Sequence, residues 1–146
     1  MQGCITRLLR AATDLILPRS CVHCGHSCNH RDYEFLCKKC ASAIFFALDP
    51  CCTTCGYPYL GAFVDPKLCP HCAELDPLFD EGRTLFLAQG PGRSILHELK
   101  YRRGFYILRD IAKMVLNSSD YTSYIKGATL IPVPLHPAKF RARGFN

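Results

Sequence analysis

Four Cys-x-x-Cys motifs decide the fold of this chain, and they read Cys21-Val-His-Cys24, Cys37-Lys-Lys-Cys40, Cys52-Thr-Thr-Cys55 and Cys69-Pro-His-Cys72. Twelve residues separate the first two motifs, and thirteen separate the last two. Two residues between cysteines let both sulfurs reach one tetrahedral ion at about 2.3 Å. The spacing therefore predicts two consecutive zinc ribbons over residues 20–76, each with a four-sulfur site.

The two predicted ribbons repeat one another beyond their cysteines. A glycine follows the first motif of each ribbon (Gly25 and Gly56), and an alanine follows the second (Ala41 and Ala73). Glycine suits a position after the second sulfur, because such a tight turn often needs a positive φ. Equivalent positions lie 31 or 32 residues apart, which indicates a tandem duplication.

Both four-thiolate sites are interpreted as structural, because four protein ligands leave no open position for water. Two Zn²⁺ ions would then supply much of the folding energy of this segment. The predicted ligands are Cys21, Cys24, Cys37, Cys40, Cys52, Cys55, Cys69 and Cys72. The alternatives are one surviving site with the other decayed, or disulfides, which would favour an exported chain. The cysteines left over are Cys4, Cys28 and Cys51, and the nearby histidines are interpreted as surface residues.

Charge is divided unevenly along the 146 residues. The formal charge is +6, and two four-thiolate zinc sites would lower it by four. Residues 1–92 contain eight Lys/Arg and nine Asp/Glu, whereas residues 93–146 contain ten and three. A polyanion is therefore expected at the C-terminal third and not at the ribbons. Eleven cysteines without an export signal indicate a reducing compartment, so we expect a cytoplasmic protein.

A short amphipathic helix is predicted before the ribbons, over residues 3–17 of an N-terminal segment 1–19. Its charged residues, Arg7, Arg10 and Asp14, argue against a membrane span. We expect this helix to pack against the rest of the protein, with a membrane-surface helix as the alternative.

Residues 77–146 show a different pattern, in which apolar blocks alternate with segments of helical periodicity. The predicted elements are a strand over 83–88, helices over 93–101 and 107–115, a polar loop over 118–126 and a strand over 128–133. One further short helix is predicted between the two ribbons, over residues 41–48. Strand, helix, helix and strand in this order predict an α/β unit with a parallel or mixed sheet.

A basic loop is predicted after the last strand. Pro134 and His136 leave that strand, and Lys139, Arg141 and Arg143 follow. Ligands of open α/β sheets bind outside the carboxyl ends of the strands, so this loop is a candidate cradle for phosphate or pyrophosphate. A solvated basic loop is the alternative.

Two segments resemble a known family. Leu130-Ile-Pro-Val-Pro-Leu-His-Pro-Ala-Lys-Phe-Arg-Ala-Arg-Gly-Phe-Asn146 resembles the signature of the ComF family of bacterial competence proteins, and Gly90-Pro-Gly-Arg-Ser-Ile-Leu-His-Glu-Leu-Lys-Tyr-Arg-Arg-Gly104 resembles its other internal motif. The doubled ribbon after Leu-Pro-Arg-Ser-Cys21 matches the N-terminus of that family. The resemblance implies a double zinc ribbon followed by the N-terminal part of a type I phosphoribosyltransferase-like α/β domain, and a link to DNA uptake in natural transformation.

The resemblance also implies ligands and roles. In the intact protein the Pro-Val-Pro loop would contact the pyrophosphate of 5-phosphoribosyl diphosphate, with Mg²⁺ as an accompanying ion. The implied phosphate-binding residues are Lys100, Arg102, Pro134, His136, Arg141 and Arg143. The family's acid-acid-Thr-Gly signature lies downstream of Asn146, so we expect a C-terminally truncated fragment without transferase activity. Catalytic residues and the acceptor stay unknown, and single-stranded DNA or other competence proteins are candidate partners.

Two other functions compete with this interpretation. A single-stranded nucleic-acid-binding module without transferase activity would place its basic tail on phosphates and stack Tyr101, Phe105 and Tyr106 on bases. The helical spacing of these aromatics favours a role in the core instead. A redox or zinc-buffer protein would use the cysteines directly, although four-thiolate ribbons usually bury their sulfurs.

Overall fold

A computed structural model describes residues 18–28, 32–59 and 68–146. The helix predicted over residues 3–17 lies outside this part. The described helices are α2 (Lys38–Ser42), α3 (Pro70–Leu75), α4 (Gly90–Arg102), the 3-10 helix η1 (Phe105–Ile107), α5 (Leu108–Asn117), α6 (Ser119–Ile125) and α7 (Pro137–Arg143). Among them, none combines the length and apolarity that a membrane span requires.

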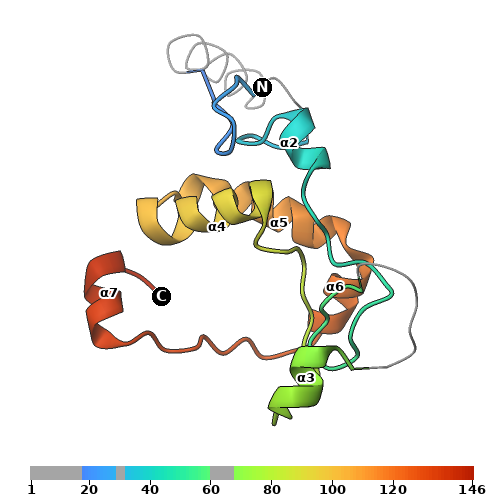
Figure 1. The fold of residues 1–146 in the computed structure, drawn as a ribbon. Coiled ribbons are helices and arrows are strands. Elements are labelled where there is room, and N and C mark those ends of the chain that lie inside the picture. The colour runs from blue at the N-terminus through green and yellow to red at the C-terminus, as the bar shows by residue number, and fades with distance from the viewer. Residues whose placement is uncertain (1–17, 29–31, 60–67) are drawn as a thin grey trace.

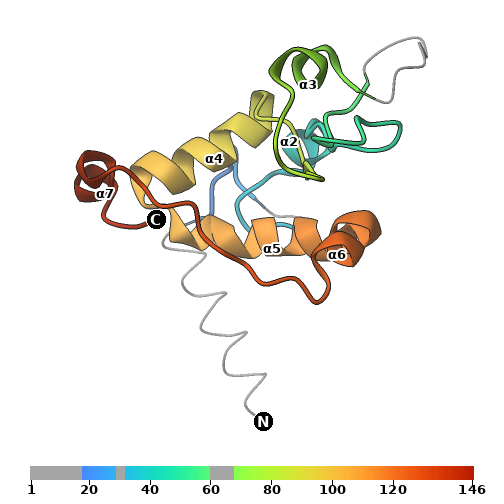
Figure 2. The same cartoon turned by 90° about the horizontal axis from the view of Figure 1, so that it is seen from below.

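Helices α4 and α5 form the centre of the described structure. Figure 1 shows them side by side, with α2 of the first ribbon above and α3 of the second ribbon below. An extended chain runs from α6 to α7, which lies beside the C-terminal end of α4 (Figure 2). The helices predicted over 93–101 and 107–115 are thus confirmed. Helix α4 begins earlier, at Gly90, because Pro91 in its first turn lacks an N–H and has a φ suited to a helix.

One core joins the first ribbon to these helices. Its buried members are Cys21, Leu36, Cys40, Ile44, Ile95, Ile107 and Met114. Two of them are predicted zinc ligands, and three belong to α4, η1 and α5. Complete burial of an aliphatic side chain stabilises a fold by about 1.5–3 kcal/mol. The first ribbon is therefore one folding unit with the helices.

The helix predicted over residues 41–48 is wrong for most of its length. Helix α2 ends at Ser42, and residues 43–48 are not helical. Phe46 forms an antiparallel bridge with Phe86, and the N–H of Ala47 donates to the carbonyl of Leu85 at 3.1 Å. Aromatic and β-branched residues pack well in extended chain, and pairing with residues 85–87 satisfies the backbone here.

The two strands predicted in residues 77–146 are not formed as strands. Residues 85–87 make only the short pairing with residues 45–47. Residues 128–133 are extended without a partner strand among the described residues, although the side chain of Asn146 donates to the carbonyl of Val133 at 3.0 Å. Leu130, Ile131 and Val133 are 80–83% exposed. An apolar run alone does not provide the partner strand that a sheet requires. The predicted parallel or mixed sheet is therefore not seen in the part of the chain that the structure describes.

Two segments predicted as loops are helices. Residues 119–125 form α6, whose N-cap Ser118 accepts a hydrogen bond from the N–H of Tyr121 at 3.4 Å. Residues 137–143 form α7, which starts at Pro137 and ends at Arg143, followed by the C-cap Gly144 with φ +84°. Both helices are short and polar, so hydrophobic periodicity did not reveal them, although their caps are visible in the sequence.

Candidate functional site

The two ribbons repeat the same backbone geometry at their first motifs, as expected from the repeat in the sequence. In each first motif, the N–H of the glycine donates to the carbonyl of the first cysteine at 2.9 Å, from Gly25 to Cys21 and from Gly56 to Cys52. Both glycines have a positive φ, +75° and +68°. The predicted left-handed turn is therefore present twice.

The second motif of each ribbon opens a helix. Cys37 is the N-cap of α2, and Cys69 is the N-cap of α3. The second cysteine of each motif, Cys40 or Cys72, is buried three residues further on, in the first turn. A turn of helix places residues i and i+3 on one side, so both sulfurs face the first motif of their ribbon.

The eight predicted ligands form two groups of four sulfurs. Cys21, Cys24, Cys37 and Cys40 make site I, and Cys52, Cys55, Cys69 and Cys72 make site II. Within each site all sulfurs lie within 4.8 Å of one another. The Cys24–Cys37 and Cys55–Cys69 pairs are both 3.6 Å apart. Four sulfurs at about 2.3 Å from a tetrahedral ion would be separated by about 3.8 Å, so each group fits one Zn²⁺.

The sulfur distances do not fit the disulfide alternative. A disulfide needs sulfurs at about 2.05 Å, and the cysteines in the described ranges are all unpaired thiols. Four thiolates are also a donor set that a closed structural zinc site prefers. The chain therefore contains two Cys4 centres suited to structural zinc.

Backbone N–H groups prepare one thiolate in each site. Burial raises the pKa of the Cys21 thiol. Hydrogen bonds from the backbone of Cys37 and of its own motif lower this pKa by a larger amount, so that the net value is about 6. The same balance of burial and backbone donors lowers the pKa of Cys52 to about 6, and the Cys69 N–H lies 3.3 Å from its sulfur. The thiolate is the form that binds zinc, so these donors favour metal binding at neutral pH.

The two sites differ in what surrounds them. Site I shares the main core with Ile95, Ile107 and Met114 of the helices. Site II forms a separate small cluster of its own cysteines with Tyr59. The chain around Thr84 nevertheless packs closely against the second ribbon. A Cβ on Gly56 would lie only 2.8 Å from the backbone nitrogen of Thr84.

A buried carboxylate fastens the first ribbon to α5. Asp110 is 0% exposed, and its two oxygens accept hydrogen bonds from the backbone N–H groups of Glu34 and Phe35, each at 2.8 Å. Next to it, Lys113 donates to the carbonyl of Asp32 at 2.9 Å. Asp110 is not among the functional residues predicted from the sequence. The signal was present, since residues 107, 110, 111 and 114 share one helical face.

A cationic cavity of about 190 Å³ lies between the C-terminal end of α4 and α7. Its lining residues are Lys100, Tyr101, Arg103, Lys139, Ala142 and Arg143. The guanidinium of Arg143 also lies 5.8 Å from the ring centre of Tyr101 and 5.9 Å from that of Phe145. Four positive charges and no carboxylate thus border this hollow, which favours an anionic ligand.

The cavity includes only part of the predicted phosphate-binding set. Lys100 and Arg143 line it, together with Lys139 of the predicted basic loop, while Arg103 is an addition that sequence reasoning missed. Four predicted residues lie elsewhere, namely Arg102, Pro134, His136 and Arg141. Of these, Arg102 forms an ion pair with Glu98 at 3.5 Å.

The remaining three have no place in the cavity lining. His136 is the N-cap of α7, where its Nδ1 accepts from the N–H of Ala138 at 3.3 Å. Pro134 lies in the exposed extended chain, and Arg141 is exposed on α7. The structure therefore gives His136 a structural hydrogen bond.

One family matches part of the chain. Residues 12–73 match the double zinc ribbon domain, a range that includes all eight ligands of the two Cys4 sites. No curated protein and no solved structure matches the chain. The helical part that follows residue 73 lies outside the matched range.

Proposed function

We propose that this double-zinc-ribbon chain is of the ComF type, linked to DNA uptake, and that its α4–α7 cavity binds the phosphate groups of a ligand such as 5-phosphoribosyl diphosphate. One observation carries the proposal. The two segments that resemble ComF motifs outside the ribbons, 90–104 and 130–146, contribute all the residues that line the cationic cavity. Segments far apart in sequence thus meet where phosphate would bind.

The charge of the cavity supports an anionic ligand. The C-terminal ends of α4 and α7 both lie at this point, and each helix end carries a partial charge of about −0.5. Lys100, Arg103, Lys139 and Arg143 supply four full positive charges, which exceed the helix contributions. Guanidinium and ammonium groups form strong charge-assisted hydrogen bonds with phosphate oxygens.

Magnesium has a limited place in this proposal. The six residues that line the cavity include no carboxylate, the usual protein ligand of Mg²⁺. In the proposed complex, Mg²⁺ would therefore be held chiefly by the diphosphate itself. The zinc ribbons act as a scaffold, because closed four-thiolate sites have no open coordination position.

Removal of two cavity cations tests the binding site. In Lys139→Gln/Arg143→Gln, the affinity of the zinc-loaded protein for inorganic pyrophosphate is expected to fall at least about tenfold, since a charge-assisted hydrogen bond contributes about 1.5–3 kcal/mol. Titration calorimetry at low salt measures the affinity of both proteins for pyrophosphate. Calorimetry with 5-phosphoribosyl diphosphate follows, and no binding would argue against that ligand.

A matched variant separates the cavity from general charge. Lys126→Gln/Arg141→Gln removes the same charge, and neither residue lines the cavity. We expect its affinity for pyrophosphate to change less than threefold. Equal weakening in the two double variants would show that net charge, and not this cavity, attracts the anion.

Single-stranded nucleic acid is a second candidate ligand, favoured by a row of rings and a guanidinium. The rings of His97 and Tyr101 are 4.9 Å apart, and those of Phe105 and Phe145 are 4.8 Å apart. Arg143 lies near both Tyr101 and Phe145. Bases stack on such groups. A binding constant for single-stranded DNA that falls steeply with salt and drops in Tyr101→Ala would support this candidate, whereas one that barely changes with salt would exclude it.

A further inference from the structure

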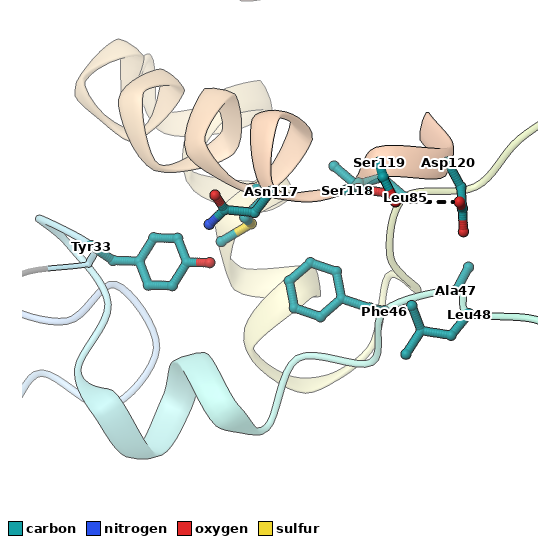
Figure 3. Close-up of a pocket in the computed structure, with 10 residues that line it drawn as sticks. Tyr33, Phe46, Ala47, Leu48, Leu85, Asn117, Ser118, Ser119 and Asp120 are labelled. Carbon is teal, nitrogen blue, oxygen red and sulfur yellow. Dashed lines mark hydrogen bonds between the residues drawn. The ribbon is translucent and has the colours of Figure 1, made fainter. Parts of the chain in front are cut away.

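A second cavity lies at the opposite end of the α4–α5 pair from α7. It has a volume of about 300 Å³ and opens between the first ribbon, the chain that joins the ribbons, and the turn from α5 to α6. Figure 3 shows the residues that line it. It shares no residue with the cationic cavity, so it is separate from the phosphate site proposed above.

The floor of this cavity is apolar and supported by the core. Phe46, Leu85 and Met114 line it, and Met114 is 1% exposed. The ring of Phe46 is held by an edge-to-face contact with Phe86, with ring centres 6.5 Å apart. Ligand pockets span about 300–1,000 Å³, so a cavity of this size suits a small molecule with one flat apolar ring.

Polar groups lie at both ends of the floor. The hydroxyl of Tyr33 and the side chain of Asn117 lie at one end. Ser119 and Asp120 lie at the other, where the Ser119 hydroxyl donates to the Asp120 carboxylate at 3.4 Å. Figure 3 shows the Phe46 ring between these two ends. Asp120 is the one charged residue in the lining, so the cavity itself is anionic.

The negative charge continues outside the cavity. A neighbouring cleft of about 440 Å³ shares Ala47, Ser118 and Asp120 with it and adds the carboxylates of Asp49 and Glu81. The single cation in that cleft, Arg83, is paired with Glu81 at 2.5 Å. The exit from the apolar floor therefore repels phosphate and attracts a protonated amine.

We propose that this cavity binds a small molecule that joins a flat apolar ring to a protonated amine. The ring lies over Phe46, Leu85 and Met114, and the ammonium group donates to the carboxylate of Asp120. This site is independent of phosphate binding, and it combines the apolar body and the few oriented polar groups that small-molecule sites share.

Two probes of similar shape and opposite charge test the proposal. 2-Phenylethylamine and 3-phenylpropanoate are titrated into the zinc-loaded, ¹⁵N-labelled chain and followed by NMR. The amine is expected to bind at least about tenfold more tightly than the acid, with saturable shifts at Phe46, Met114, Asn117 and Asp120. In Asp120→Asn that preference is expected to disappear, while Asp80→Asn, an equal charge change outside both hollows, keeps it.

A further variant keeps the test independent of the carboxylate. Ala47→Phe places a ring in the cavity and is expected to abolish the shifts, with the spectrum of the zinc-loaded variant checking its fold. The proposal is overturned if neither probe gives saturable shifts or if the two probes bind equally. It is equally overturned if the amine binds folded Asp120→Asn or Ala47→Phe as it binds the parent chain.

Discussion

Cys40→Ser is expected to unfold α4 and α5, whereas Cys72→Ser is expected to leave them folded. Cys40 is a ligand of site I and lies in the same core as Ile95, Ile107 and Met114. Structural zinc contributes about 10–16 kcal/mol, which is comparable to the whole stability of a small domain. Loss of zinc from site I therefore removes support from the helices, whereas site II supports mainly its own small cluster.

Hydrogen exchange distinguishes the two variants. In Cys72→Ser, one zinc per chain is expected, with amides of α4 and α5 protected as in the parent. In Cys40→Ser, protection of those amides should fall to the level of local unfolding. Equal protection of α4 and α5 in the two variants would contradict the unequal roles of the two sites.

Asp110→Asn is expected to lower the free energy of unfolding by about 2–4 kcal/mol. The carboxylate accepts from two backbone N–H groups, those of Glu34 and Phe35. The amide of asparagine keeps one acceptor oxygen but turns an N–H₂ donor toward the other N–H, which leaves a buried donor without a partner. Such a loss costs about 1–3 kcal/mol, and the lost charge weakens the remaining bond.

Urea unfolding of the zinc-saturated protein, followed by circular dichroism, measures this difference. Asp120→Asn is the matched control, since it makes the same chemical change on an exposed side chain and is expected to shift stability by less than about 0.5 kcal/mol. An Asp110→Asn variant as stable as this control would show that the carboxylate does not fasten the ribbon to α5.

The metal centres could be predicted because zinc chemistry fixes their spacing. Two sulfurs of one motif must reach one ion, so the positions of Cys21 to Cys72 determine the grouping without knowledge of the rest of the fold. Helices α4 and α5 were predictable because apolar residues recur at helical spacing over nine or more positions. Local rules were sufficient in both cases.

Elements that depend on distant contacts or on capping were harder to predict from the sequence. The apolar residues Ile44 to Phe46 would suit either a helix or an extended chain. Only the pairing of Phe46 with Phe86 decides between the two conformations. Ser118 before α6 and Pro137 with Gly144 around α7 are capping signals that a search for apolar periodicity overlooks.

The cationic cavity illustrates the same limit. Lys139, Ala142 and Arg143 lie three and four residues apart, so they share a face only if this segment is a helix. In the predicted loop, Arg141 and Arg143 seemed equivalent, yet only Arg143 lines the cavity. Recognition of the Pro137 and Gly144 caps would have identified that face from the sequence.

Zinc content, measured together with zinc K-edge X-ray absorption on the purified chain, tests most directly the claim that two four-sulfur centres hold the ribbons. We predict two zinc ions per chain, each with four sulfur neighbours at about 2.3 Å and no nitrogen or oxygen ligand. One ion per chain, or a first shell that includes histidine nitrogen or water oxygen, would contradict it.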